Sequence, residues 1–308
     1  MDLHKLTYPI MIAKETSLSK AAEKLFITPS ALSQYITKEE ENLNIQLFVR
    51  SRGNWMPTAA GKLYIETAQK LLDINSNMER QLLDMADCNS GQFSLGVTPG
   101  RGTAMFANVY PQFSEAYPDI SIHLIEEKWA RLQSLMLDNT LDLSFTYISD
   151  IKHEISPSLE AEVLADEEFV LFVPRKHPVA RLYDRAPQKP LTIDLSIFAN
   201  DKFICMGKDT TLYNVTRKLF DKAGIDPTII FESTSTVTMH NLVRRGFGIA
   251  VLPKFYAKES EHAVYFKITP YMNQMVVAVT KKGFQQSTAM KYFTSLAQNW
   301  YRQYDENE

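Results

Sequence analysis

The stretch Thr28-Pro29-Ser30-Ala31-Leu32-Ser33-Gln34 decides how the first part of this chain folds. Threonine is a favoured residue immediately before a helix, because its hydroxyl accepts a hydrogen bond from a free N–H of the first turn. Proline suits the first helical position, where its missing N–H would have had no partner. The stretch therefore predicts a helix that starts at Pro29 and reaches about Leu43.

Two shorter helices are expected before it, from residues 3 to 13 and from Ser17 to Leu25, because apolar residues recur there at helical spacing. Helix, brief turn and second helix form the helix-turn-helix pattern. The second helix of such a unit enters the major groove N-terminus first, which would bring polar side chains to base edges. These side chains are Ser30, Ser33, Gln34 and Thr37. A solvated polar face on an ordinary three-helix domain explains the same spacing equally well.

The residues that follow favour the DNA-binding interpretation. An apolar and basic segment, Leu47-Phe48-Val49-Arg50, is followed by the turn Arg52-Gly53-Asn54 and by the helix-start pattern Pro57-Thr58-Ala59-Ala60-Gly61. This order predicts a β-wing that leads into a further helix.

Taken together, these segments resemble the LysR-type transcriptional regulators, which read S-F-T-x-A-A, then S-Q-P-A-L-S, then L-F-x-R, then L-T-x-A-G. The matching segments here are Ser17-Leu18-Ser19-Lys20-Ala21-Ala22, Thr28 to Ser33, Leu47 to Arg50, and Pro57 to Gly61. The resemblance implies an all-α winged helix-turn-helix over residues 1–60 that binds double-stranded DNA. Carried over by position, it places base reading on Pro29, Ser30, Ser33 and Gln34, a phosphate contact on Arg50, and the wing tip on Arg52 to Asn54.

Three residues depart from the family pattern: Pro9 replaces an aromatic residue, Gln34 a frequent arginine, and Glu39 an apolar residue. Pro9 is expected to kink or restart the first helix, because proline lacks a backbone donor and clashes with the preceding turn. Gln34 moves the expected base preference from guanine toward adenine, since an amide pairs with the N6 and N7 edge of adenine.

Residues 61–89 predict a long helix with a narrow apolar seam. Its members alternate in steps of four and three: Tyr64, Ala68, Leu71, Asn75, Met78, Leu82 and Met85. Such a seam favours pairing with a second copy, with Asn75 fixing the register, although packing on its own domain remains an alternative. The resemblance implies that this helix is the linker and dimer contact.

From residue 90 onward, strands alternate with helices, which indicates an α/β domain with a largely parallel sheet. A first round runs to a strand at Leu141 to Tyr147, and a second contains strands at Glu168 to Val173 and Lys202 to Met206. A strand from Gln274 to Thr280 and a helix from about Thr288 to Gln303 complete the domain.

Ligands of open α/β sheets bind beyond the carboxyl ends of the strands, so these ends and the adjacent helix starts are the candidate effector site. The helix starts favour an anion, and a small carboxylate is the simplest ligand. The candidates are Thr98, Pro99, Gly100, Arg101, Thr103, Tyr147, Met206, Thr210, Ser233 and Thr234. Simple helix capping is the alternative role for the hydroxyls, and solvation the alternative for Arg101.

The LysR resemblance extends through this region at Tyr117-Pro118-Asp119-Ile120, Leu141-Asp142-Leu143, residues 174–178 and residues 246–253. It implies a periplasmic-binding-protein-like effector domain, with subdomain I at 90–161 and 268–308 and subdomain II at 162–267. It further implies two crossover strands, an effector in the cleft between the subdomains, and a homotetramer whose DNA heads are repositioned by the effector.

The bulk composition fits a folded, two-domain protein of 308 residues, with 45% hydrophobic and 22% charged residues. The net charge of −3 provides no general basic coat, although residues 1–62 carry eight Lys or Arg against six acids. No apolar run predicts a membrane span or secretory signal, so a cytoplasmic location is expected, with Cys88 and Cys205 as reduced thiols without a role.

Two other functions are alternatives to a regulator. An α/β enzyme would need a recognisable site, but the sequence contains no Gly-rich phosphate loop, no G-x-S-x-G and no H-E-x-x-H, and the six histidines are scattered. An exported solute-binding protein would have no use for the first ninety residues. We therefore expect no enzymatic activity, no cofactor and no metal, and binding of a small effector without turnover.

Overall fold

The computed structural model describes residues 3–51, 54–85, 91–185, 190–208, 210–256 and 260–306. The chain divides into two compact units, Met1–Cys88 and Asn89–Glu308. Among the described residues, the first unit has one buried hydrophobic cluster and the second unit has three.

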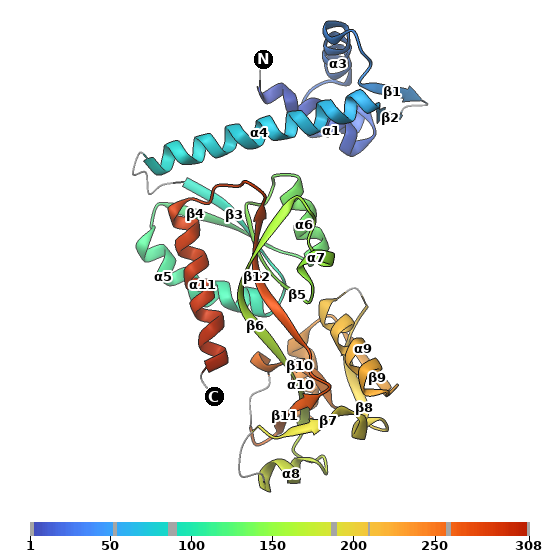
Figure 1. Cartoon of the computed structure of the whole chain (residues 1–308), viewed down its shortest axis with the longest axis vertical. Helices are drawn as coiled ribbons and strands as arrows, with labels where there is room; N and C mark the ends of the chain where they lie inside the picture. Colours follow the sequence, from blue (N-terminus) through green and yellow to red (C-terminus); the bar gives the residue numbers. More distant parts are fainter. Residues whose placement is uncertain are drawn as a thin grey trace. The chain divides into compact units, whose positions relative to one another are not determined.

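The first unit is a small helical domain with a two-stranded wing (Figure 1). Its core is formed by residues from its helices and its wing, among them Ile12, Ala22, Leu32, Ile36 and Trp55. Its elements are η1 (Leu3–Leu6), α1 (Thr7–Glu15), α2 (Leu18–Lys24), α3 (Pro29–Leu43), β1 (Phe48–Ser51), β2 (Asn54–Pro57) and α4 (Ala59–Met85). The predicted winged helix-turn-helix and the long helix behind it are confirmed.

Pro9 restarts the first helix, as the sequence predicts. A short 3-10 helix, η1, ends at Leu6, and α1 begins at Thr7 with Pro9 in its first turn. Backbone N–H groups of a first turn have no intrahelical partner, so the missing donor of proline costs nothing there.

The junction between the wing and α4 depends on Thr58 and Gly61. The Thr58 hydroxyl accepts a hydrogen bond from the Gly61 N–H at 2.9 Å and donates one to the Gln46 carbonyl at 2.7 Å. A Cβ at residue 61 would lie 2.0 Å from the Leu47 carbonyl oxygen. Only glycine therefore allows the helix to start this close to the wing strand.

The second unit is an α/β domain (Figure 1). In chain order its elements are β3 (Gly91–Val97), α5 (Arg101–Ala116), β4 (Ile120–Glu126), α6 (Trp129–Leu137), β5 (Leu143–Ile148), α7 (Ile151–Glu154), β6 (Leu159–Pro174), α8 (Ala180–Arg185), β7 (Thr192–Asp194), η2 (Leu195–Phe198), β8 (Lys202–Met206), α9 (Thr211–Ala223), β9 (Thr228–Ser233), α10 (Thr236–Arg244), β10 (Ala250–Pro253), η3 (Lys254–Tyr256), β11 (Ala263–Thr269), β12 (Asn273–Lys281) and α11 (Thr288–Glu306).

The sheet is mixed, and the expectation of a largely parallel sheet is wrong. The strand order is β4-β3-β5-β12-β6-β11-β7, with β10 also paired to β6, while β8 and β9 form a separate parallel pair. β3 runs parallel to β4 and β5, but β12 runs antiparallel to both of its neighbours. The returning strand at the end of the chain therefore enters the sheet in the opposite direction.

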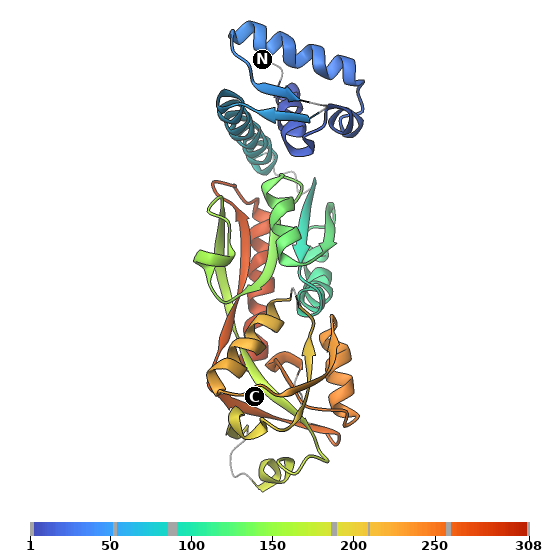
Figure 2. The same ribbon diagram turned by 90° about the vertical axis from the view of Figure 1, so that its right-hand side faces the viewer.

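Strand β6 is longer than predicted and contributes residues to all three buried hydrophobic clusters of the second unit (Figure 2). The sequence predicts a strand from Glu168, whereas β6 begins at Leu159. Its first part pairs with β12 as far as Glu168, and its second part, from Phe169, pairs with β10 and β11. Strand β11 was not expected at all.

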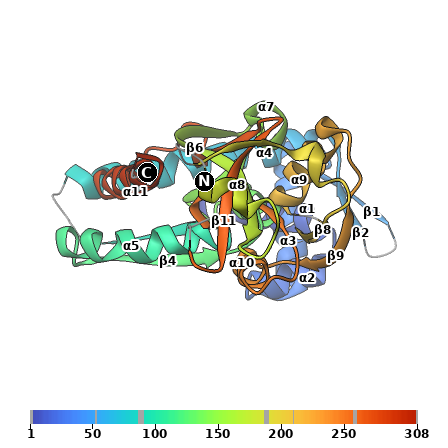
Figure 3. The same ribbon diagram turned by 90° about the horizontal axis from the view of Figure 1, so that it is seen from below.

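Helices α5 and α11 lie side by side in the second unit (Figures 1 and 3). Phe113 of α5 packs against Tyr292 and contacts Phe293 of α11 edge to face. Phe113 and Phe293 belong to one buried cluster, and their contact fixes the position of α5. The start of α5 carries several of the candidate effector residues.

Candidate nucleic-acid interface and effector site

Helix α3 begins as the sequence predicts. Thr28 has an extended backbone, and its hydroxyl accepts a hydrogen bond from the Ala31 N–H at 3.2 Å, with Pro29 as the first helical residue. The Ser30 hydroxyl lies 3.1 Å from that of Thr28. The predicted cap is confirmed, so the leading end of the helix needs no partner from outside to be stable.

The two faces of α3 differ in what they contact. Leu32 and Ile36 are fully buried in the core of the first unit, whereas Pro29, Ser30 and Gln34 are exposed. Neither the Gln34 amide nor the half-buried Ser33 hydroxyl has a hydrogen-bond partner among the described residues. The polar groups expected to read bases are therefore available to an outside ligand.

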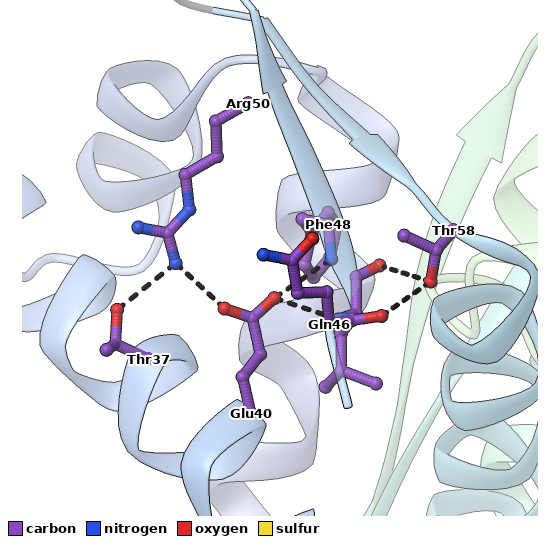
Figure 4. Close-up of polar contacts among 7 residues, drawn as sticks. Thr37, Glu40, Gln46, Phe48, Arg50 and Thr58 are labelled. Atoms are coloured by element: carbon purple, nitrogen blue, oxygen red, sulfur yellow. Dashed lines mark hydrogen bonds and ion pairs between the residues drawn. The ribbon is translucent and has the colours of Figure 1, made fainter. Parts of the chain in front are cut away.

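Glu40 joins α3 to the wing (Figure 4). One carboxylate oxygen accepts hydrogen bonds from the N–H groups of Leu47, at 2.8 Å, and Phe48, at 3.0 Å. The other accepts a hydrogen bond from the Arg50 guanidinium at 2.9 Å. Glu40 was not singled out from the sequence, because three consecutive glutamates at 39–41 suggest a solvated surface.

Arg50 is held in place by three partners. Besides bonding to Glu40, its Nη2 donates to the Thr37 hydroxyl at 3.1 Å (Figure 4). Its guanidinium carbon lies 4.3 Å from the centre of the Trp55 ring. The side chain is still 43% exposed, which leaves guanidinium donors facing outward. Thr37, grouped with the base-reading residues from the sequence, is thus placed beside the wing arginine.

The remaining wing residues are only partly described. Asn54 is exposed at the start of β2 and bridges to Ser17, while the Trp55 N–H donates to the Thr16 carbonyl at 2.8 Å. The wing is thereby fastened to the turn between α1 and α2. Arg52 lies outside the described residues.

Glu39, which replaces an apolar residue of the family pattern, has a partner on α4. The Tyr64 hydroxyl donates to a Glu39 carboxylate oxygen at 3.3 Å. Partial burial, together with the nearby Glu39 charge, raises the pKa of Tyr64. The polar substitution therefore creates a direct hydrogen bond between α3 and α4.

The predicted seam of α4 has two parts. Ala68 is buried and Tyr64 packs against the core of its own unit, whereas Met78 is 50% and Leu82 57% exposed. Asn75 donates along the helix to Glu79 at 2.9 Å. The N-terminal part of the seam thus packs on its own domain, and the apolar C-terminal part has no covering surface within the chain's described residues.

In the second unit, the loop between β3 and α5 and the first turn of α5 contain five of the candidate effector residues. Gly100 is the N-cap of α5 with φ 88°, and a Cβ there would lie 2.5 Å from the Tyr256 hydroxyl. The hydroxyl oxygens of Thr98 and Thr103 are buried and have no hydrogen-bond partner among the described residues. Such unpaired groups are costly, which marks this loop as incomplete on its own.

Arg101 is buried rather than solvated. It is 3% exposed and forms an ion pair with Glu167 of β6, which is 1% exposed. Its guanidinium carbon lies 5.0 Å from the centre of the Phe255 ring and 5.2 Å from that of Tyr301. Because Glu167 already compensates its charge, Arg101 holds the loop against β6, and a direct role toward an anion would require it to leave this partner.

Tyr147 lies beside the same cluster. Its hydroxyl is 3.4 Å from that of Tyr301. Burial raises the pKa of Tyr147 well above its usual value, and burial raises the pKa of Tyr301 to about 12. Both hydroxyls therefore stay neutral and can donate or accept hydrogen bonds.

The other candidate effector residues form a second group at the ends of β8 and β9. Met206 and Ser233 are paired in register. Thr210 caps α9, accepting from the Tyr213 N–H at 3.2 Å and donating to the Gly207 carbonyl at 2.9 Å. The Ser233 hydroxyl bonds to the backbone of Ser235, and Thr234 is exposed. Capping and turn formation, the alternative left open by the sequence, thus occupy Thr210 and Ser233.

A hollow of about 560 Å³ is lined by none of the candidate effector residues, although Thr211, next to Thr210, lines it, and the sequence did not predict it. One wall follows the end of β5 and the other is the first half of α9. Its lining residues are Ser149, Asp150, His153, Glu154, Thr211, Asn214, Arg217 and Lys218. The carboxylates of Asp150 and Glu154 accept hydrogen bonds from backbone N–H groups at residues 149–152. The side chains of Asn214 and Lys218 have no partner among the described residues.

The described residues contain no cluster of three or more His, Cys, Asp or Glu that could hold a metal ion. Nor is any described helix long and apolar enough to cross a membrane. Cys205 is 5% exposed, and burial raises the pKa of its thiol to about 12, so the thiol stays protonated and acts as a packing residue. Cys88 lies outside the described residues.

Comparison with known proteins covers both units. Residues 3–62 match the model of the bacterial regulatory helix-turn-helix proteins of the lysR family, and residues 86–302 match the LysR substrate binding domain. An uncharacterised HTH-type transcriptional regulator of Bacillus subtilis, YybE, is 27% identical over 91% of each chain.

Solved structures share the fold at low sequence identity. A point variant of full-length OxyR from Pseudomonas aeruginosa is 21% identical, covers 97% of this chain and 98% of its own, and superposes with a TM-score of 0.67. The effector binding domain of QuiR in complex with shikimate is 21% identical, covers 70% of this chain and 98% of its own, and has a TM-score of 0.55. With both family models matched in order along nearly the whole chain, the protein belongs to the LysR family of transcriptional regulators.

Proposed function

We propose that this LysR-type regulator recognises a specific operator through the leading end of α3 and is controlled by a small anionic effector bound in the second unit. The observation that carries the DNA-binding part is the leading end of α3, which is capped from within and where the Ser33 hydroxyl and the exposed Gln34 amide have no hydrogen-bond partner among the described residues. Pro29, Ser30, Ser33 and Gln34 would contact bases. Arg50, supported by Thr37, would contact phosphate, with Asn54 and Arg52 at the wing tip.

The base-reading assignment is tested with a duplex selected by the wild-type chain from a random-sequence pool. Replacing Ser33 and Gln34 together with alanine should weaken binding to that duplex by about 10- to 100-fold, because base contacts are lost, and weaken binding to a scrambled duplex much less. Arg50→Ala is the matched control, since loss of a phosphate contact should weaken both duplexes alike. Equal losses on both duplexes for the double variant would contradict the assignment.

We further propose that two copies pair through α4. The exposed apolar side chains Ile74, Met78 and Leu82 occupy the C-terminal part of this helix, where the seam lacks a partner among the described residues. Leu82→Glu should therefore lower the molar mass seen by light scattering toward that of a monomer, whereas Leu63→Glu, exposed near the start of the helix, should not. A tetramer, implied by the family resemblance, would appear as twice the dimer mass.

The proposed effector site is the cleft at the strand ends of the second unit. The unpaired buried hydroxyls of Thr98 and Thr103 support it, because a bound carboxylate would accept hydrogen bonds from both. Pro99, Gly100 and Arg101 would shape this side, Tyr147 would offer a neutral hydroxyl, and the opposite side would come from β8 and β9. Those residues are Met206, Thr210, Ser233 and Thr234. The shikimate held by the QuiR domain is itself a small carboxylate.

Thermal shift against a panel of small carboxylates, shikimate included, tests the effector site, because a ligand that binds only the folded form raises its melting temperature. Thr98→Val keeps the shape of the side chain and removes its hydroxyl, and should abolish the shift. Thr211→Val, in the neighbouring hollow, is the control. A shift that survives Thr98→Val would contradict the location.

In this proposal the protein binds its operator and its effector without converting either, and it acts inside the cell, where the DNA is. Its alternatives, a solute-binding protein or an α/β enzyme, would leave the first unit without a purpose. Failure of the wild-type chain to enrich any duplex from the random pool would favour those alternatives.

A further inference from the structure

Phe26 is the most exposed large apolar side chain described in the chain, at 95% exposure. It lies in the turn between α2 and α3, and its backbone is left-handed, with φ 56°. Its neighbour Ile27 packs against the core of the first unit, whereas Phe26 touches none of it. The turn therefore directs one apolar residue inward and presents the other outward.

The backbone at Phe26 is set by the way α2 ends. The Phe26 N–H donates to the Glu23 carbonyl at 3.1 Å, and the Ile27 N–H donates to the Ala22 carbonyl at 3.0 Å. These two bonds form a Schellman motif, in which the residue after the helix cap is left-handed and is usually glycine. Phenylalanine thus stands at a position that favours a residue without a Cβ.

The phenylalanine carries two costs that glycine would remove. A left-handed conformation is strained for an L-residue with a bulky side chain, and full exposure forfeits the stabilisation that burial of the ring would provide. Strained residues of this kind occur preferentially at functional sites. No contact with the described residues of the unit offsets either cost. A bound ligand that covers the ring would provide the missing stabilisation.

The turn lies beside the leading end of α3. Phe26 is four residues before Ser30, so the two Cα atoms are at most about 14 Å apart. The major groove is about 12 Å wide, so a side chain this close to a base-reading residue reaches the groove or its rim. In that groove the thymine C5-methyl group is the apolar partner that an aromatic side chain can contact.

We propose that Phe26 is a specificity-determining residue that packs against the C5-methyl group of a thymine at the edge of the half-site. The proposal rests on the proposed function, since it assumes that α3 enters the major groove. It adds apolar readout at a position that hydrogen-bonding residues do not reach. The selected operator should then contain a thymine flanking the bases read by Ser30 and Gln34.

The experiment uses the full chain and the duplex selected by the wild type from a random pool. Phe26→Ala should weaken binding to this duplex roughly tenfold, as expected for loss of one buried apolar contact. Phe26→Asn, a residue that tolerates the left-handed backbone, should give the same loss with the turn intact. Phe247→Ala removes another exposed phenylalanine, 62% exposed and in the second unit, and should leave affinity unchanged.

Replacing the flanking thymine with deoxyuridine removes only the methyl group. The wild type should then lose about as much affinity as Phe26→Ala does, while Phe26→Ala should not respond to the replacement. If the wild type does not respond to deoxyuridine at any flanking position, or if Phe26→Ala weakens the scrambled duplex equally, the base contact is overturned. A changed oligomeric state with unchanged affinity would overturn it in favour of contact with a second copy.

These outcomes are separable from those of the proposed function. If the wild type enriches no sequence from the pool, the proposed function itself fails. If the wild type enriches a sequence that Phe26→Ala binds equally well, only the role of Phe26 fails.

Discussion

The dipeptide Thr-Pro precedes two helices of this protein, and the two copies have different environments. Thr28-Pro29 opens α3, where Thr28 caps the helix and Pro29 is exposed at its first position. Thr98-Pro99 precedes α5, where Gly100 is the N-cap, no side chain caps the helix, and the Thr98 hydroxyl is buried without a partner among the described residues. The same two residues thus complete one helix start and leave the other unsatisfied.

The two helix starts are suited to ligands of different size. α3 is internally satisfied and exposed, so its side chains can extend toward a large partner such as a DNA groove. The start of α5 is enclosed, with Arg101 and Gly102 buried and Tyr256 close to Gly100, and we propose that a small molecule supplies the missing partners there.

The largest effect is expected at the enclosed start. Glu167→Ala leaves the Arg101 charge buried and unpaired, and should lower the free energy of unfolding of the second unit by about 3–5 kcal/mol. Urea unfolding followed by tryptophan fluorescence measures it, since two of the three tryptophans, Trp129 and Trp300, lie in the second unit, Trp300 beside Arg101. Glu168→Ala is the control, because its partly exposed pair with Lys267 at 3.7 Å should cost no more than about 1 kcal/mol. Similar losses for the two variants would contradict the importance of burial.

An intermediate effect is expected where α3 meets the wing. Glu40→Ala removes the acceptor of two backbone N–H groups and the partner of Arg50, and should destabilise the first unit by about 1–3 kcal/mol. Helix content on heating, measured by circular dichroism, reports the change. Glu40→Gln retains one acceptor oxygen and should lose less, and the exposed Glu41→Ala should lose almost nothing. An unchanged melting temperature in Glu40→Ala would show that the wing does not depend on this contact.

The smallest effect separates a threonine that caps from one that does not. Thr210→Ala removes the cap of α9 and should cost about 1 kcal/mol of stability, whereas Thr98→Val removes an unpaired buried hydroxyl and should cost nothing or stabilise. Denaturant midpoints of the two variants in the absence of ligand provide the comparison. A larger loss for Thr98→Val would mean that its hydroxyl already has a partner.

The sequence predicts those features that depend on local chemistry. The α3 start follows from Thr28 and Pro29, and the restart of the first helix from Pro9. In each case the determining residues are neighbours along the chain. The wing follows from the residue order between Leu47 and Gly61, and the family resemblance supplied the two-subdomain organisation of the second unit.

Features that depend on distant residues were not predictable. The first half of β6 is rich in acidic residues, which disfavour strands, and it forms because β12 pairs along it. Arg101 and Glu167 are far apart in sequence, and nothing local indicates that they meet in a buried ion pair. Some of the expected site residues, such as Gln34 and Thr98, have side chains without a hydrogen-bond partner among the described residues, whereas others, such as Thr210, already cap a helix. Only the structure distinguishes the two kinds.

The central claim, that the exposed leading end of α3 reads base edges, is tested most directly by changing what it reads. Gln34→Arg should be carried through the same selection from a random pool as the wild type, because arginine pairs with guanine where glutamine pairs with adenine. The predicted result is a selected site that changes from adenine to guanine at one position of each half-site and stays the same elsewhere. Selection of an identical sequence by both chains would contradict the claim.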